Sequence, residues 1–164
     1  MLLFICLILL FTFIIRLLVM EYSAASVHPD EIFQTIEPAH KLAFGYGMMA
    51  WEWTEGIRSW FLPFIYMVIL KISNLSGIND SIYLAGVIYL FNIFLSLITV
   101  YSMFIIGKEA GGIKVGVISA LSGATCPLIT VYAHRPLSES LSLNFIMLSM
   151  ALIYRKMPGR LLLW

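Results

Sequence analysis

The sequence predicts an all-α integral membrane protein, a polytopic helical bundle whose long first external loop carries short amphipathic helices. Of its 164 residues, 61% are hydrophobic and 12% are charged, whereas about a quarter of the residues in a soluble domain are charged. The mean hydropathy is +0.95. Residues 28–58 nevertheless hold five of the nine acidic side chains. This composition excludes an ordinary soluble domain, and the lack of a basic stripe in the sequence argues against a nucleic-acid partner.

Four apolar runs predict the membrane-spanning helices. They cover residues 1–20, 82–106, 113–133 and 139–154. A helix needs about 20 residues to cross about 30 Å of hydrocarbon, so the first three runs are long enough and the fourth is short. Residues 1–20 have an alternative, a signal peptide cleaved at Ser23-Ala24-Ala25. We expect a span instead, because no Lys or Arg precedes the run and Arg16 interrupts its far end.

The basic residues predict which side of the membrane each segment faces. Lys and Arg concentrate in the cytoplasmic loops of membrane proteins. Here they gather in Gly107–Lys114 and Tyr154–Arg160, which the alternation of spans places on one side. Residues 21–81 then form a non-cytoplasmic loop, provided that residues 60–73 do not cross. That segment is short and contains Pro63, so we predict an interfacial or re-entrant helix.

The external loop opens with two adjacent carboxylates, Asp30 and Glu31, that follow Pro29. Proline in a first turn, with acidic residues at the positive end of the helix dipole, predicts a helix start. Pro38 should end or kink this helix. The carboxylate pair can deprotonate a hydroxyl group or bind a cation; equally, it can serve only to cap the helix.

Helical spacing predicts two faces for the same segment. One face holds Asp30, Gln34 and Glu37. The other holds Ile32, Phe33 and Ile36. We expect the apolar face to lie on the membrane and the carboxylates to point away from it.

Metal ligation is an open alternative for this loop. Glu37 and His40 stand at i and i+3, as in helical metal sites, and His28 is the other nearby histidine. A divalent cation is therefore possible, but we assign no metal ligands. Cys6 and Cys126 both lie in apolar runs, which predicts neither a disulfide framework nor a zinc site.

The cationic residues each have two interpretations. Glu52, Glu55 and Arg58 stand at i, i+3 and i+6, which predicts a salt-bridge ladder, although the planar fork of Arg58 also suits a phosphate. His134 and Arg135 follow the run 113–133. They either anchor the chain at the interface or face the same site as the loop.

The loop also resembles a known family. The pattern HPDE-x-x-Q-x-x-E-x-x-H, followed by FGYG, WEWTEGIRSW and Pro63, resembles the first lumenal loop of glycosyltransferase family 22, the Alg9-like and GPI-anchor mannosyltransferases of the GT-C superfamily. A second stretch, YAHRPLSESL at Tyr132–Leu141, is similar to a lumenal segment of that family. Ala50 stands where the family usually has threonine, and Glu139 where it usually has asparagine.

The resemblance implies a GT-C-type membrane fold and an inverting α-mannosyltransferase. The donor would be polyprenyl- or dolichyl-phosphate mannose, and the acceptor a lipid-linked glycan. The residue match makes Asp30 the base that takes the acceptor's proton, with Glu31 supporting it or positioning the acceptor, and Arg58 and Arg135 the charges beside the phosphate. Substrate-binding positions implied by the match are His28, Gln34, Glu37, His40, Trp51, Glu52, Arg58 and Arg135.

The resemblance also implies a place and a partner for the chain. We expect an integral, multi-pass protein of the endoplasmic reticulum in a eukaryote, or of the cytoplasmic membrane in a prokaryote. Family members are several times longer, so we expect an N-terminal portion, cut off after residue 164 and inactive alone. The alternatives are a non-catalytic membrane fragment or subunit, or part of a transporter, although ionisable residues here cluster at span ends rather than at mid-span.

Overall fold

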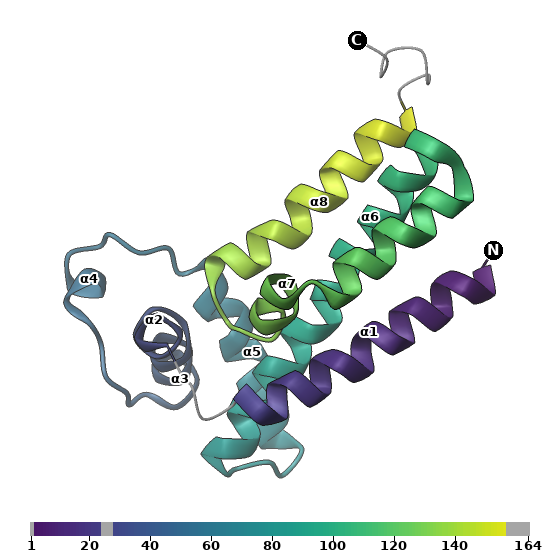
Figure 1. The fold of residues 1–164 in the computed structure, drawn as a ribbon. Helices are drawn as coiled ribbons and strands as arrows, with labels where there is room; N and C mark the ends of the chain where they lie inside the picture. The colour runs from purple at the N-terminus through teal and green to yellow at the C-terminus, as the bar shows by residue number, and fades with distance from the viewer. Residues whose placement is uncertain (1, 24–27, 157–164) are drawn as a thin grey trace.

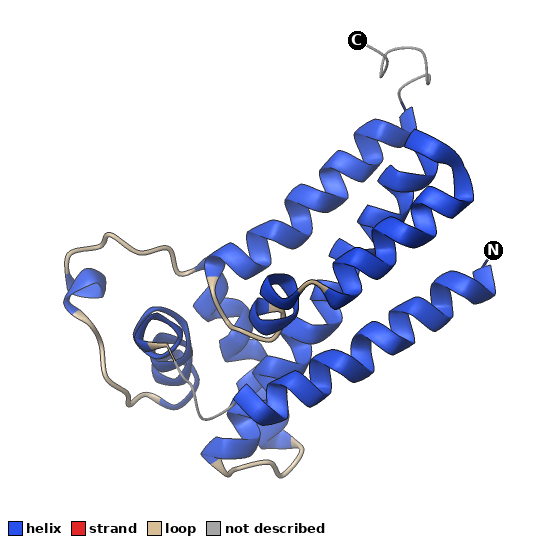
Figure 2. Ribbon diagram, in the orientation of Figure 1, coloured by secondary structure: helices blue, strands red, loops and turns tan. Residues whose placement is uncertain are grey.

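The structure, a computed structural model, describes residues 2–23 and 28–156 and is all-helical in that part (Figures 1 and 2). Its elements, in order, are α1 (Leu2–Ser23), α2 (Pro29–Glu31), the π-helix η1 (Ile32–Ile36), α3 (Glu37–Phe44), α4 (Trp51–Thr54), α5 (Phe61–Leu75), α6 (Ser81–Thr125), α7 (Pro127–Tyr132) and α8 (Ser138–Lys156). No strand occurs among these residues. The prediction of an all-α chain is therefore confirmed over the described part.

The helix α6 is a hairpin of two helical arms rather than one rod. Unbroken, its 45 residues would extend about 67 Å. Gly111 and Gly112 have non-helical dihedral angles, and Gly112 takes φ +80°, which is accessible to glycine at little cost. The arms then pack closely, because a Cβ added at Gly116 would lie 2.9 Å from the carbonyl oxygen of Phe104. Small residues permit such an approach between helices.

The second arm of α6 ends earlier than the apolar run 113–133 suggests. It stops at Thr125, and Cys126 is extended at φ −60° and ψ 117° before Pro127 begins α7. Proline disfavours the helical conformation in the residue before it. The uninterrupted helix over 113–133 is therefore wrong at its far end, where α7 is a separate short helix.

Two apolar cores join these elements. The first lies between α1, α6 and α8 and contains Ile5, Ile8, Val100, Phe104, Ile105, Ala120, Ala124 and Ala151. The second joins α3 and α5 to α6 and α8 and contains Ala39, Leu62, Tyr66, Leu70, Leu84, Ile88 and Leu141. In the second core the Tyr66 hydroxyl donates a 2.9 Å hydrogen bond to Asn92 Oδ1 on α6. The helices α2, α3 and α4 thus lie beyond one end of the bundle, held there by α5 (Figure 1).

Two of the described helices are long and apolar enough to cross a membrane: Leu3–Ser23 of α1, and α6. α5 is a shorter apolar helix. Two polar contacts connect helices inside the bundle: Arg16 donates to Ser96, and Thr99 Oγ1 donates to Asn144 Oδ1 at 2.7 Å. The possible cleavage site at Ala24-Ala25 and the basic residue Arg160 lie outside the described residues.

Candidate functional site

Asp30 is accessible at the start of the loop's first helix. His28 is the N-cap of α2, and its Nδ1 accepts a 3.3 Å hydrogen bond from the backbone N–H of Asp30. The Asp30 carboxylate lies 3.6 Å from the same ring nitrogen, and half of its side chain is exposed. Pro29 precedes it in the first turn, as predicted. Asp30 can therefore reach a ligand from solvent.

Glu31, the next residue, has the opposite environment. Its side chain is 1% exposed, and its Oε1 accepts a 2.7 Å hydrogen bond from Nη1 of Arg135, which is itself buried. Successive helical residues point about 100° apart, so one carboxylate of the pair faces outward and the other faces the bundle. Burial raises the pKa of Glu31, and the Arg135 guanidinium opposes that rise.

The π-helix η1 determines which side chains after Glu31 face the interior of the protein. Proline lacks an N–H group and its ring crowds the carbonyl four residues back; a wider turn ahead of Pro38 relieves both conflicts and lets the helix continue through it. The residues buried along this segment are Glu31, Thr35, Pro38 and Ala39. Ile32, Phe33 and Ile36, the apolar face expected to lie on the membrane, are not fully buried within the protein, and their contact with the membrane stays a prediction.

Thr35 adds a second tie between η1 and the segment that holds Arg135. Its Oγ1 lies 2.6 Å from the carbonyl oxygen of Glu31 and 2.8 Å from that of Pro136. The hydroxyl thus links the helix to the residue after Arg135. The sequence offered no signal for this role, because a threonine inside a helix has no distinctive local pattern.

His134 joins the same segment to α1 and α6. Its Nε2 lies 3.1 Å from Ser23 Oγ, and its ring meets the edge of the Tyr89 ring at a centroid distance of 5.6 Å. The side chain is 1% exposed. Burial and the neighbouring Arg135 charge lower the pKa of His134 from 6.5 to about 4, so the ring is neutral at physiological pH.

Arg58 forms an ion pair with Glu52. Its Nε and Nη2 each donate a 2.9 Å hydrogen bond to Glu52, one to each oxygen. This pairing raises the pKa of Arg58, and the charges of Asp30 and Glu139 add to the rise. The same bond lowers the pKa of Glu52. The predicted helical ladder of Glu52, Glu55 and Arg58 is wrong, because α4 ends at Thr54 and Arg58 pairs with Glu52 across a turn rather than with Glu55 along a helix.

The two tryptophans of α4 differ in role. Trp53 is 8% exposed, and its indole N–H donates a 2.9 Å hydrogen bond to the carbonyl oxygen of Phe33. Its ring packs on Trp60 at a centroid distance of 4.3 Å. Trp51, the predicted substrate contact, is 67% exposed. Trp53 therefore anchors the loop to η1, while Trp51 remains accessible.

Glu37 and His40 support the loop after α3. Glu37 Oε2 accepts a 2.7 Å hydrogen bond from the backbone N–H of Met48, and His40 Nδ1 lies 3.0 Å from the carbonyl oxygen of Tyr46. A Cβ on Gly47 would stand 3.0 Å from Glu37 Oε2, so glycine lets the loop approach. Both residues have protein partners in this structure, and their contact with a substrate remains a prediction.

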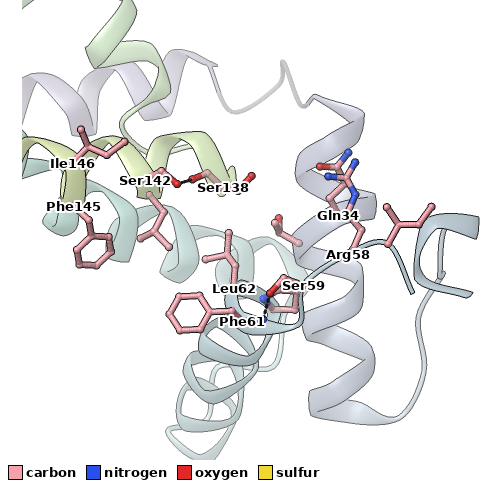
Figure 3. Close-up of a pocket in the computed structure, with 13 residues that line it drawn as sticks. Gln34, Arg58, Ser59, Phe61, Leu62, Ser138, Ser142, Phe145 and Ile146 are labelled. Carbon is pink, nitrogen blue, oxygen red and sulfur yellow. Dashed lines mark hydrogen bonds between the residues drawn. The ribbon is translucent and has the colours of Figure 1, made fainter. Parts of the chain in front are cut away.

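Four of the predicted site residues line two separate cavities. One, of about 590 Å³, lies between the loop, α5 and α8, and Gln34 and Arg58 line it together with Ser138 (Figure 3). The other, of about 320 Å³, is lined by Glu37 and His40. Asp30 and Glu139 belong with the first group by their electrostatic effect on Arg58. Within the described residues no group of three or more His, Cys, Asp or Glu side chains is placed to hold a metal ion.

Comparison with known proteins finds a matching family and several relatives. The profile of the Alg9-like mannosyltransferase family matches residues 7–160. The GPI mannosyltransferase 3 of Yarrowia lipolytica is 50% identical over 52 residues, which cover 32% of this chain and 10% of that protein. The human GPI alpha-1,2-mannosyltransferase 3 is 43% identical over 76 residues, covering 46% of this chain and 14% of that protein.

A third relative extends the comparison further along the chain. The GPI alpha-1,2-mannosyltransferase 3 of Danio rerio is 34% identical over 92 residues, covering 56% of this chain and 17% of that protein. The chain thus spans less than a fifth of the length of these curated relatives. No solved structure matches it.

Proposed function

The chain belongs to the Alg9-like mannosyltransferase family, and on that premise we propose that the complete protein is a membrane mannosyltransferase with Asp30 as its catalytic base. The donor is a polyprenyl- or dolichyl-phosphate mannose, and the acceptor is a lipid-linked glycan. The observation that carries the proposal is the difference in environment between two adjacent carboxylates. Asp30 is accessible, while Glu31 is buried against Arg135.

The reaction requires one proton acceptor and one anion-stabilising group. The acceptor hydroxyl oxygen attacks C1 of mannose while its proton passes to an Asp30 oxygen. The bond between C1 and the phosphate oxygen breaks, and the lipid phosphate leaves with the electron pair. Attack opposite the leaving group inverts the configuration at C1. Arg58 supplies the positive charge that the departing phosphate needs, since it lines the cavity beside the loop and its charge interacts with that of Asp30.

Glu31 and Arg135 act as positioning residues in this proposal. A buried ion pair with good geometry holds its two segments in a fixed relation, whatever its net effect on stability. Here the pair, with Thr35 and Pro136, holds the start of the loop helix against the segment after α7. This arrangement aims Asp30 outward. It also favours a role for Arg135 beside Glu31 rather than on the phosphate.

The placement of the two ends of the bundle supports the proposed orientation of the protein in the membrane. Gly107–Lys114, the predicted cytoplasmic turn, lies at the opposite end of the bundle from the helices of the external loop (Figure 1). This separation supports the proposed orientation, in which loop 21–81 is on the non-cytoplasmic side of a multi-pass GT-C-type bundle. In a eukaryote that side is the lumen of the endoplasmic reticulum. A lipid-bound donor explains why polar chemistry sits at a membrane surface, because its tail stays in the bilayer.

The test measures mannose transfer from radiolabelled polyprenyl-phosphate mannose in membranes that contain the complete protein. The variant is Asp30→Asn, and Asp80→Asn is its matched control, because Asp80 is also an exposed carboxylate at a helix start. We expect Asp30→Asn to lose at least about 100-fold in rate at equal protein level, and the control to keep its activity. Full activity in Asp30→Asn would remove Asp30 as the base. No transfer by the wild type, across several acceptors, would leave a non-catalytic family member.

A further inference from the structure

His28 stands directly before the helix that presents Asp30, and its ring lies close to both the backbone and the carboxylate of that residue. We propose that His28 is a positioning residue for Asp30 and that protonation of its ring inactivates the carboxylate. The inference rests on the proposed function, because it adds a pH-dependent regulation to the base that the function assigns. It is separate from the substrate contact predicted for His28, since here the ring acts on Asp30.

The neutral ring holds the start of the helix in place. Its Nδ1 accepts a hydrogen bond of 3.3 Å from the backbone N–H of Asp30, two residues ahead. The backbone N–H of Glu31 donates to the carbonyl oxygen of His28 at 3.0 Å. A ring nitrogen that accepts a hydrogen bond carries no proton, so the neutral ring has its proton on Nε2. The side chain of His28 therefore fixes the backbone from which the Asp30 carboxylate projects.

The protonated ring cannot make the same contact. Both nitrogens of an imidazolium are donors, so the Nδ1–H group would face the N–H group of Asp30. The Asp30 carboxylate, 3.6 Å from that nitrogen, accepts from it instead and forms a charge-assisted hydrogen bond. The backbone N–H then loses its cap. Because an adjacent cation favours the charged form of a carboxylate, Asp30 also becomes a weaker proton acceptor.

The position of the ring lets it respond to the pH of the solvent. The side chains of His28 and Asp30 are 61% and 50% exposed. Histidine changes its charge between about pH 5 and 8. The preferred N-cap residues are serine, threonine, aspartate and asparagine, and none of these gains a positive charge in that range. A histidine at this position therefore adds a pH response that an ordinary cap lacks.

Other charged groups act on the pair of His28 and Asp30. By the contacts of the described residues, they are Glu31, Glu52, Arg58, Arg135 and Glu139. Glu31 favours the cationic form of the ring, whereas the positive end of the helix dipole disfavours it. All of these groups remain when His28 alone is replaced. Comparison with such a variant therefore isolates the effect of the ring.

The first experiment measures kcat for mannose transfer by the complete protein in membranes between pH 8 and 5, per folded molecule and at saturating donor. His28→Asn keeps a side chain that can cap the helix and removes the titrating ring. Asp80→Asn is its matched control, because Asp80 caps α6 in the same way, accepting from an N–H two residues ahead.

The expected result is a difference in pH dependence. From pH 8 to 5, kcat should fall at least about tenfold in the wild type and in Asp80→Asn, and less than about threefold in His28→Asn. Equal falls in the wild type and His28→Asn overturn the proposal. A KM that rises in His28→Asn by one factor at every pH, with the wild-type pH dependence of kcat, would make His28 only a substrate contact.

A second variant, His28→Ala, separates the cap from the charge. It removes the titrating ring as His28→Asn does, but it provides no acceptor for the Asp30 N–H. At pH 8 we expect His28→Ala to be about fivefold slower than His28→Asn, the factor that one N-cap typically contributes to a helix start. Equal rates at pH 8 would overturn the positioning role.

NMR of the complete protein with isotope-labelled histidine, in nanodiscs, gives a readout that needs no substrate. The signal of His28 is the one that His28→Asn removes. We expect no proton on Nδ1 at pH 8, and protonation of the ring at a lower pH in Asp30→Asn, because the carboxylate that stabilises the cation is lost. A proton on Nδ1 at pH 8, or an identical titration in Asp30→Asn, overturns the proposal. Absence of mannose transfer would refute the proposed function, while this readout would still decide the contact.

Discussion

Glu31 and Arg135, 104 residues apart in the sequence, form a 2.7 Å ion pair in which both side chains are buried. The pair connects the start of the external loop helix to the segment between α7 and α8. Thr35 and Pro136 repeat the connection one turn later. These contacts hold the loop against the bundle at Glu31. The position of the accessible Asp30 carboxylate is therefore fixed by the residue next to it.

Breaking this pair should destabilise the protein strongly. Arg135→Gln leaves the Glu31 carboxylate buried without its countercharge, which typically costs about 3–5 kcal/mol. Denaturant unfolding of the reconstituted protein measures the loss. The double variant Glu31→Gln with Arg135→Gln should recover more than half of it. Arg58→Gln, which breaks a partly exposed pair, should cost no more than about 1 kcal/mol; equal costs for the two arginines would contradict the argument.

His134 should make stability depend on pH. Its pKa is about 4 when folded and 6.5 in the ordinary state, so the unfolded chain takes up a proton first as the pH falls. Stability should therefore drop between about pH 6.5 and 4, by up to roughly 3 kcal/mol. Above pH 6.5 both states are neutral at this residue and the effect vanishes.

The comparison of His134→Gln with the wild type isolates this effect. Glu31 acts in the opposite sense, because its raised pKa removes stability as the pH rises, but it is present in both proteins. The variant's unfolding free energy should vary less between pH 4 and 6.5. Parallel pH profiles for the wild type and His134→Gln would contradict the prediction.

Gly112 should be required by the turn of α6. Its φ of +80° is unfavourable for residues with a Cβ, so Gly112→Ala should destabilise the protein by roughly 1–2 kcal/mol even though the added methyl group meets open space. Gly86→Ala is the matched control, because Gly86 also faces open space but is helical. There alanine should stabilise by up to about 1 kcal/mol. Thermal unfolding of both variants gives the sign of each change.

Trp53 should matter more than Trp51 for the folded loop. Trp53→Phe keeps an aromatic ring but loses the hydrogen bond to the Phe33 carbonyl, a net cost of about 1 kcal/mol or more. Trp51→Phe, at a largely exposed position, should leave stability within about 0.5 kcal/mol. Proteolysis of the loop in each variant, followed by mass spectrometry, checks the difference. Faster cleavage in Trp51→Phe would reverse the assignment.

Local patterns made several features predictable. Pro29 before two carboxylates predicted the helix start at which Asp30 lies. The motifs of the loop also pointed to the family that the comparison confirmed. The substrate-binding roles of His28, Gln34 and Trp51 stay predictions that rest on that resemblance.

The sequence by itself determined a strongly apolar chain, helical throughout its described residues, with five of its nine acidic residues in one loop, because composition, proline and glycine act on their own neighbours. Only the tertiary structure decided that Glu31 turns inward, that a π-turn ahead of Pro38 buries Thr35, and that Gln34 and Arg58 share a cavity from which His40 is separated. These outcomes depend on contacts between residues far apart along the chain. The partner of a buried carboxylate is set by packing, and packing has no signature in a short stretch of sequence.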